Sequence, residues 1–160
     1  MSDGADERQR RASAYERAVA LLAQRTHFRA QLAAKLAKRG YPAGEVEEAL
    51  DRLAGHGYLD DRRAAREYAE GRLARGPLGR RRLAADLARQ GAPPAAVDAV
   101  LDELLPEDDR AAARQAAEAW LARRRGAAKP DALARHLEGR GFSPRAIWAA
   151  LESHGLAGER

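Results

Sequence analysis

The sequence predicts an all-α protein built from three tandem three-helix repeats in an elongated, curved array. A stretch of 22 residues occurs three times, at offsets of 51 and then 50 residues, over 32–53, 83–104 and 133–154. A fixed period of this length is the signature of repeat architectures. Equivalent positions carry leucine in every copy, and a glycine divides each copy at the same point: Gly40, Gly91 and Gly141.

Each copy predicts a helix–turn–helix pair. Leu32 and Leu36 are four residues apart and therefore share one helix face. The glycine that follows suits a helix C-terminus, where a left-handed backbone is favoured. A proline stands near each next helix start, where the amide hydrogens have no helical partner, and Ser143 is placed to cap the last helix. Val46 and Leu50 belong to the second apolar stripe of the first copy.

One further helix precedes each pair. These helices are predicted over 13–25, 61–75 and 109–125, the last being rich in alanine. Aspartate pairs at 60–61 and 108–109 are placed to cap the second and third of them. The predicted boundaries are a disordered tail over 1–11, repeats over 12–59, 60–106 and 107–155, and a C-terminal tail over 156–160.

The composition suits small helical modules. Hydrophobic residues make up 45% of the chain but aromatic residues only 5%, so each small core leans on its neighbours. No apolar run approaches the roughly 18 residues that span a bilayer, and the N-terminal segment lacks the apolar region of a signal peptide. The absence of cysteine excludes disulfides and thiolate chemistry. We expect a cytoplasmic protein without membrane contact, and a monomer because the terminal repeats show no large apolar face.

Basic residues gather on the first helix of each pair. The net charge is +5 and the pI is near 10.1, which favours a polyanionic partner. The densest patch lies between Arg72 and Arg89, where six arginines accompany one acid, Asp86. Arginine at a helix N-terminus opposes the helix dipole, so the run at 80–82 favours a functional role. The candidate contact residues are Arg72, Arg75, Arg80, Arg81, Arg82 and Arg89, extended by Lys35 and Lys38 in the first repeat.

The second helix of each pair does not suit base recognition. A DNA-reading helix–turn–helix inserts this helix into the major groove. In the first copy it carries four acids against one arginine, and in the second it carries three acids and no base. Phosphate repulsion opposes such an insertion. The basic residues therefore fit a long polyanionic or acidic surface better than a base-reading site.

No catalytic site and no cofactor are expected. The four histidines lack metal-ligand spacing, and no phosphate-binding glycine loop is present. Carboxylate pairs occur only at helix caps or on exposed helix faces. The sequence thus predicts a non-enzymatic protein.

Two segments resemble the RecX regulatory proteins. The first is Tyr58-Leu59-Asp60-Asp61-Arg62, preceded by Lys38-Arg39-Gly40-Tyr41; the second is Arg75-Gly76-Pro77 and the helix with Leu83 and Leu87. The resemblance spans about residues 15 to 155 and implies three tandem three-helix repeats. We assign a mainly structural role to Tyr58, Leu59, Asp60, Asp61 and Arg62: the tyrosine and leucine return to the core, and an aspartate caps the next helix.

The resemblance implies a modulator of the RecA recombinase, in most family members an inhibitor. Its members bind RecA and the RecA filament on single-stranded DNA, and they restrain ATPase, strand-exchange and coprotease activity in recombination and the SOS response. Weak direct contact with DNA is compatible with this role. The arginine contacts are suggested by charge and spacing, not by the resemblance.

Two alternatives stay open. A helical repeat protein that binds DNA or RNA without a recombinase partner predicts tight, salt-sensitive binding to bare nucleic acid. A helical scaffold whose arginines only solvate the surface predicts neither RecA binding nor nucleic-acid binding.

Overall fold

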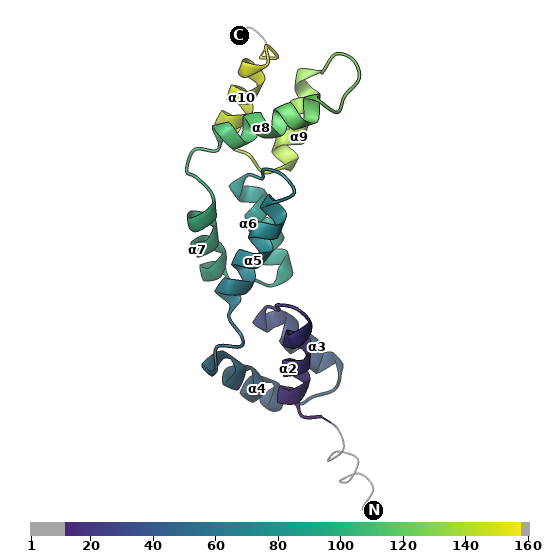
Figure 1. Ribbon diagram of the computed structural model, residues 1–160, viewed down its shortest axis with the longest axis vertical. Coiled ribbons are helices and arrows are strands. Elements are labelled where there is room, and N and C mark those ends of the chain that lie inside the picture. Colours follow the sequence, from purple (N-terminus) through teal and green to yellow (C-terminus); the bar gives the residue numbers. More distant parts are fainter. Residues whose placement is uncertain (1–11, 158–160) are drawn as a thin grey trace, which may run out of the picture. The chain divides into compact units, whose positions relative to one another are not determined.

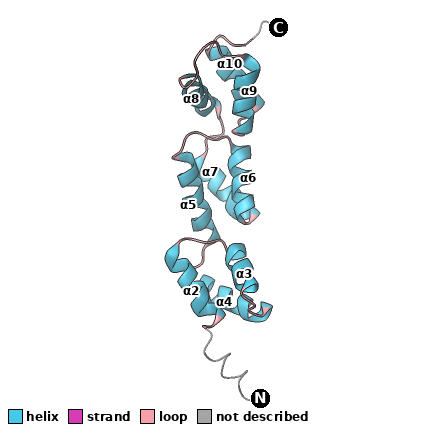
Figure 2. Cartoon of the chain, turned by 90° about the vertical axis from the view of Figure 1, so that its right-hand side faces the viewer, coloured by secondary structure: helices cyan, strands magenta, loops and turns pink. Residues whose placement is uncertain are grey.

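The computed structural model describes residues 12–157, which contain nine α-helices and no strand. Short loops join the helices (Figures 1 and 2). The helices are α2 (Ala14–Gln24), α3 (Arg29–Lys38), α4 (Ala43–Gly55), α5 (Asp61–Leu73), α6 (Arg80–Gln90), α7 (Pro94–Leu104), α8 (Arg110–Leu121), α9 (Pro130–Gly139) and α10 (Pro144–Ser153). Three consecutive groups of three helices confirm the predicted all-α repeat fold.

The boundaries of the repeats stay a prediction. The expected tail over 1–11 lies outside the described residues, as do residues 158–160 of the expected C-terminal tail. The chain divides into two compact units: one runs to Ala64 and includes residues 90–92, and the other comprises residues 65–89 and the chain from Pro93 onward. The second unit thus contains the third group of helices and most of the second group.

The first unit encloses a core formed by one face of each of its three helices. α2 begins with a capping box, in which Ser13 accepts from the Glu16 N–H while the Glu16 carboxylate accepts from the Ser13 N–H. Gly40, after α3, has φ 81°, the left-handed conformation that the sequence predicts there. The buried residues are Ala14, Ala18, Leu21, Leu32, Leu36, Val46, Ala49, Leu50, Leu53 and Leu59.

The second unit repeats this arrangement. Leu83 and Leu87 of α6, and Leu133 and Leu137 of α9, are fully buried, as the repeat predicts. α8, α9 and α10 pack around Phe142, which is 1% exposed. Each apolar stripe thus faces the core of its own helix group.

Two glycines bring the second and third repeats into backbone contact. The Gly79 N–H, just before α6, donates to the carbonyl oxygen of Arg140 over 2.8 Å. A Cβ at Gly79 would lie 2.1 Å from the Gly141 oxygen, and a Cβ at Gly141 would lie 2.2 Å from the Arg82 nitrogen. Gly141 also has φ 83°, a conformation that side chains disfavour. The start of α6 is therefore held against the turn between α9 and α10.

Two helices end earlier than the sequence predicts. The predicted third-repeat helix runs to Arg125, but α8 ends at Leu121; α5 likewise ends at Leu73, two residues early. In the turn after α8, the Arg124 guanidinium lies over the Trp120 ring, 4.1 Å from its centroid. This cation–π contact stabilises a turn where alanine and arginine propensities favour more helix. The prediction that the helix of α8 continues to Arg125 is therefore wrong, and this contact is the physical reason.

Candidate functional site

Three of the candidate arginines surround one buried carboxylate. Asp86 of α6 is 4% exposed. Its oxygens accept hydrogen bonds from Arg72 at 2.7 Å, Arg82 at 3.1 Å and Arg89 at 2.6 Å. A buried carboxylate requires such partners, so these arginines stabilise the contact between α5 and α6. One negative charge faces three positive ones, and the Asp86 cluster therefore keeps a net charge of 3 − 1 = +2.

The arginines keep Asp86 ionised. Burial alone would raise the pKa of its carboxyl group, but hydrogen bonds from Arg72 and Arg82 outweigh burial and lower the pKa below its ordinary value. The cluster is therefore a charged network at neutral pH.

Arg80 and Arg81 are exposed at the start of α6, and each contacts a neighbour. Arg80 pairs with Asp102 of α7, and Arg81 donates to the carbonyl oxygen of Glu138 over 3.0 Å. The first repeat contains the equivalent pair 51 positions earlier, where Arg29 lies 2.8 Å from Asp51. Exposed ion pairs contribute little to folding. Arg80 and Arg81 are therefore less important to the fold than the arginines around Asp86.

Arg75 differs from the other five arginines because its side chain has neither a hydrogen bond nor an ion pair in the part of the chain that the structure describes. It lies in the turn after α5. It lines a cavity together with Trp120, His136 and Arg140. In the sequence, the run of three arginines at 123–125 close to Trp120 indicates only one part of this cavity, and nothing indicates that Arg75, His136 and Arg140 join it.

In the first unit, Lys35 is bound to a buried histidine. His27 is 2% exposed; its Nδ1–H donates to the Arg25 carbonyl oxygen over 2.8 Å, and its Nε2 accepts from the Lys35 ammonium over 2.8 Å. A carbonyl oxygen only accepts, so these contacts assign the neutral ring with hydrogen on Nδ1. Burial lowers the pKa of His27, and the positive charge of Lys35 lowers it further. The hydrogen bond to the Arg25 carbonyl oxygen raises the pKa, but by less than these two effects lower it. Lys35 is thus a structural residue at neutral pH.

Lys38 has no such role. It is exposed in the last turn of α3, and its side chain forms no hydrogen bond or ion pair within residues 12–157. Its charge is available to a partner.

The aspartates of the signature cap two different helices. Asp60 accepts from the Arg63 N–H over 3.0 Å and caps α5, as predicted. Asp61 instead accepts from the Arg29 N–H at the start of α3, over 2.7 Å. In the third repeat, Asp109 likewise accepts from the N–H and hydroxyl of Ser143, at 2.8 and 2.7 Å. The second aspartate of each pair thus ties helices together, a role that the sequence did not reveal.

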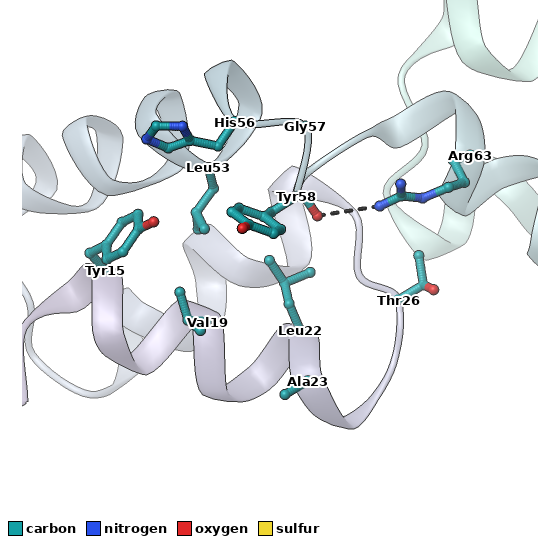
Figure 3. Close-up of a pocket in the computed structure, with 10 residues that line it drawn as sticks. All are labelled: Tyr15, Val19, Leu22, Ala23, Thr26, Leu53, His56, Gly57, Tyr58 and Arg63. Carbon is teal, nitrogen blue, oxygen red and sulfur yellow. Dashed lines mark hydrogen bonds between the residues drawn. The ribbon is translucent and has the colours of Figure 1, made fainter.

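Tyr58 lies on the surface of the first unit, where the sequence predicts a core residue. Leu59 is 6% exposed as expected, but Tyr58 is 61% exposed, so its predicted burial is wrong. The amides of both residues bond to the Leu53 carbonyl oxygen, and only Leu59 turns inward. Figure 3 shows the Tyr58 ring beside Leu22 and near Val19 of α2, in a cavity of about 700 Å³. This signature residue is therefore accessible.

Neither a membrane span nor a metal centre is visible in residues 12–157. No helix there is long and apolar enough to cross a bilayer, and no three His, Asp or Glu side chains are grouped to hold a metal ion.

Comparison with known proteins establishes the family. The regulatory protein RecX of one Thermus thermophilus strain is 42% identical over 142 residues, which cover 89% of this chain and 90% of the relative. This chain belongs to the RecX family. Models of the first and second three-helix domains of RecX match residues 14–53 and 60–101. The regulatory protein RecX of Halorhodospira halophila is 40% identical over 139 residues, 83% of each chain.

A solved RecX structure has the same fold. The crystal structure of RecX from Lactobacillus salivarius superposes with a TM-score of 0.75, covering 90% of this chain and 96% of that one. The two sequences are only 16% identical, so this likeness concerns the fold alone.

Proposed function

We propose that this RecX-family chain restrains the RecA recombinase. It binds RecA and the RecA filament on single-stranded DNA and inhibits ATPase, strand exchange and coprotease activity without chemistry of its own. The observation that carries the proposal is the 42% identity over 142 residues to a regulatory protein RecX. Cytoplasmic location and a monomeric state go with this role.

The charges of the second repeat support attraction to an anionic partner. The Asp86 cluster keeps a net positive charge, and Arg81 contacts only a neutral carbonyl oxygen. Positive charge close to the surface accelerates association with an anionic filament and weakens with salt. Arg75 has no carboxylate partner within the described chain and adds to this surface charge. In the first unit, Lys38 likewise has no carboxylate partner among the described residues.

The test is the ATPase rate of RecA on single-stranded DNA as this protein is added. We expect inhibition at amounts below one protein per RecA, with much weaker binding to the same DNA when RecA is absent. An ATPase rate that stays constant at saturating protein would contradict the proposal.

The double substitution Arg80→Gln, Arg81→Gln tests the contact surface. Loss of one or two charge-assisted contacts of roughly 1.5–3 kcal/mol raises the half-inhibitory concentration about tenfold or more. The free energy of unfolding changes by about 1 kcal/mol or less, since both side chains are exposed.

The matched control is Arg114→Gln, Arg135→Gln, which removes the same charge from exposed positions of α8 and α9. Equal effects of the two double variants on inhibition would show that only net charge matters, and would remove Arg80 and Arg81 from the contact surface.

The second candidate function is direct binding of nucleic acid without RecA. The arginines that lack a carboxylate partner favour it. Inhibition that appears only when bare DNA is already saturated would favour this function over RecA regulation.

A further inference from the structure

A small cavity in the second unit is lined by four arginines and by no acidic residue. Its volume is about 220 Å³, and it lies between the turn after α5, the end of α8 and the end of α9. The side chains that matter are Arg75, Trp120, Arg123, Arg124, His136 and Arg140.

Four guanidinium groups line this cavity without a carboxylate. None of the lining residues is acidic, and none of the four arginines forms an ion pair with the described residues. The cavity therefore differs from the Asp86 cluster, where a carboxylate is already in place. Burial lowers the pKa of Arg140, and the charges of Arg72, Arg123 and Arg82 lower it further. An anion in the cavity would relieve this repulsion.

Arg140 is held in place before any ligand arrives. Its Nε donates to the Pro77 carbonyl oxygen over 2.9 Å, and its terminal nitrogens have no hydrogen-bond partner within residues 12–157. Gly76 has φ 126°, and a Cβ at this position would lie 3.2 Å from Nη2 of Arg140. The glycine therefore leaves room for the guanidinium. An arginine fixed in this way loses little side-chain entropy on binding.

Aromatic rings form another part of the cavity. The Trp120 and His136 rings are stacked, with centroids 5.6 Å apart and planes at 28°. The Arg124 guanidinium lies 4.1 Å from the Trp120 centroid. Flat rings and guanidinium planes are the surfaces on which unpaired nucleobases stack.

We propose that this cavity binds the phosphate group of a nucleotide, with Arg75, Arg123, Arg124 and Arg140 as its ligands and Trp120 beside the base. The nucleotide is free or belongs to single-stranded nucleic acid. The guanidinium fork matches phosphate oxygens in pairs, and several converging arginines suit a phosphate better than one carboxylate. The proposal does not rest on the proposed function, because RecA takes no part in it.

Trp120 provides the measurement. The chain has two tryptophans, and Trp148→Phe leaves Trp120 as the single one in the full-length protein. Three probes are added separately at constant ionic strength: inorganic phosphate, thymidine monophosphate and a thymidine oligonucleotide of about ten residues. Each is expected to change Trp120 fluorescence with saturation, and to raise the pKa of His136, which burial and Arg140 lower in the free protein.

The probes distinguish the source of the phosphate. An oligonucleotide that binds about tenfold or more tighter than the monophosphate identifies single-stranded nucleic acid, since adjacent phosphates add contacts. Equal affinities identify a free nucleotide. Either result supports the site.

The variant Arg123→Gln, Arg124→Gln is expected to weaken binding about tenfold or more. The control Arg114→Gln, Arg135→Gln removes the same charge outside the cavity and is expected to change affinity less than about threefold. Circular dichroism checks that both variants stay helical.

Three results would overturn the proposal: no fluorescence change with any phosphate probe, equal losses in the two double variants, or equally tight binding of polyglutamate. The last result would assign the cavity to acidic peptides. Because RecA is absent, none of these outcomes bears on ATPase inhibition, and failure of the two proposals can be told apart.

Discussion

Asp86 decides which arginines of the second repeat serve the fold. The sequence shows six arginines and one acid in this stretch, and the surplus of arginine favours a partner site. The structure places that acid among Arg72, Arg82 and Arg89. The single acid of this stretch is therefore buried and binds three arginines. On an exposed helix face, the same acid would contribute little to stability.

Asp86→Asn is expected to destabilise the second unit by roughly 1.5–3 kcal/mol, because it removes the charge that accepts hydrogen bonds from three partly exposed arginines. Asp98→Asn, at an exposed position of α7, is the matched control and is expected to cost less than about 0.5 kcal/mol. Urea unfolding measures both. Equal midpoints would show that Asp86 does not carry the network.

The same substitution changes the acid limb of the stability curve. The folded pKa of Asp86 is lowered, so its contribution is complete above the unfolded value of 3.8 and is lost as pH falls through the folded pKa. Unfolding measured from pH 5 downward is therefore expected to be less pH-dependent in Asp86→Asn than in the unchanged protein.

At the scale of helices, one position of the repeat carries a different polar residue in each copy, next to a leucine that is the same in all three. The residues before the equivalent leucines Leu36, Leu87 and Leu137 are Lys35, Asp86 and His136. Each contacts a different neighbour: a buried histidine, three arginines, and a tryptophan ring. The period preserves the leucine that fills the core and leaves the adjacent polar residue free to change.

The close approach of Gly79 to Gly141 predicts how a side chain at Gly79 would affect the packing of α6 against the end of α9. Gly79→Ala is expected to destabilise the second unit by about 3 kcal/mol, because its Cβ would lie 2.1 Å from the Gly141 oxygen and backbone would have to move. Gly71→Ala lies inside α5 with open space around it, and is expected to stabilise by about 0.5–1 kcal/mol. Thermal unfolding compares them. A stabilising Gly79→Ala would disprove the close approach.

Helix starts were more predictable than helix ends. Ser143 caps α10 as the sequence predicts, because the capping signal lies within three residues. Ser13, predicted only as the start of the first helix, caps α2 in the same way. The end of α8 depends on Arg124 folding over Trp120, a contact that competes with good helix propensity.

At the scale of the whole molecule, the two compact units predict two unfolding transitions. Both tryptophans, Trp120 and Trp148, lie in the second unit, whereas all helices contribute to circular dichroism. Fluorescence is therefore expected to follow the second unit alone, and circular dichroism to show an additional transition. Asp86→Asn should shift only the transition seen by fluorescence. Coincident curves for both signals would contradict two separate units.

The fold was predictable from sequence because its signals recur. The same spacing of apolar residues and the same dividing glycine appear in all three copies. A pattern repeated three times is not a coincidence, so it predicts the helices reliably. The site was less predictable, since partners of charged side chains are set by packing between distant segments. The Arg140 side chain donates to the Pro77 carbonyl oxygen, 63 positions away. Even the nearer pair of Lys35 and His27 is set by the turn before α3 and not by a spacing within one helix. Whether the remaining candidates contact RecA stays a prediction.

The burial of Asp86 has a practical consequence at the bench. Dissolved salt screens exposed charges within about 8–10 Å, but it reaches a buried ion pair poorly. The proposed attraction between the surface arginines and an anionic partner is therefore expected to fail at a lower salt concentration than the ion pairs between α5 and α6. A salt wash on a column is expected to release such a partner while the protein itself stays folded.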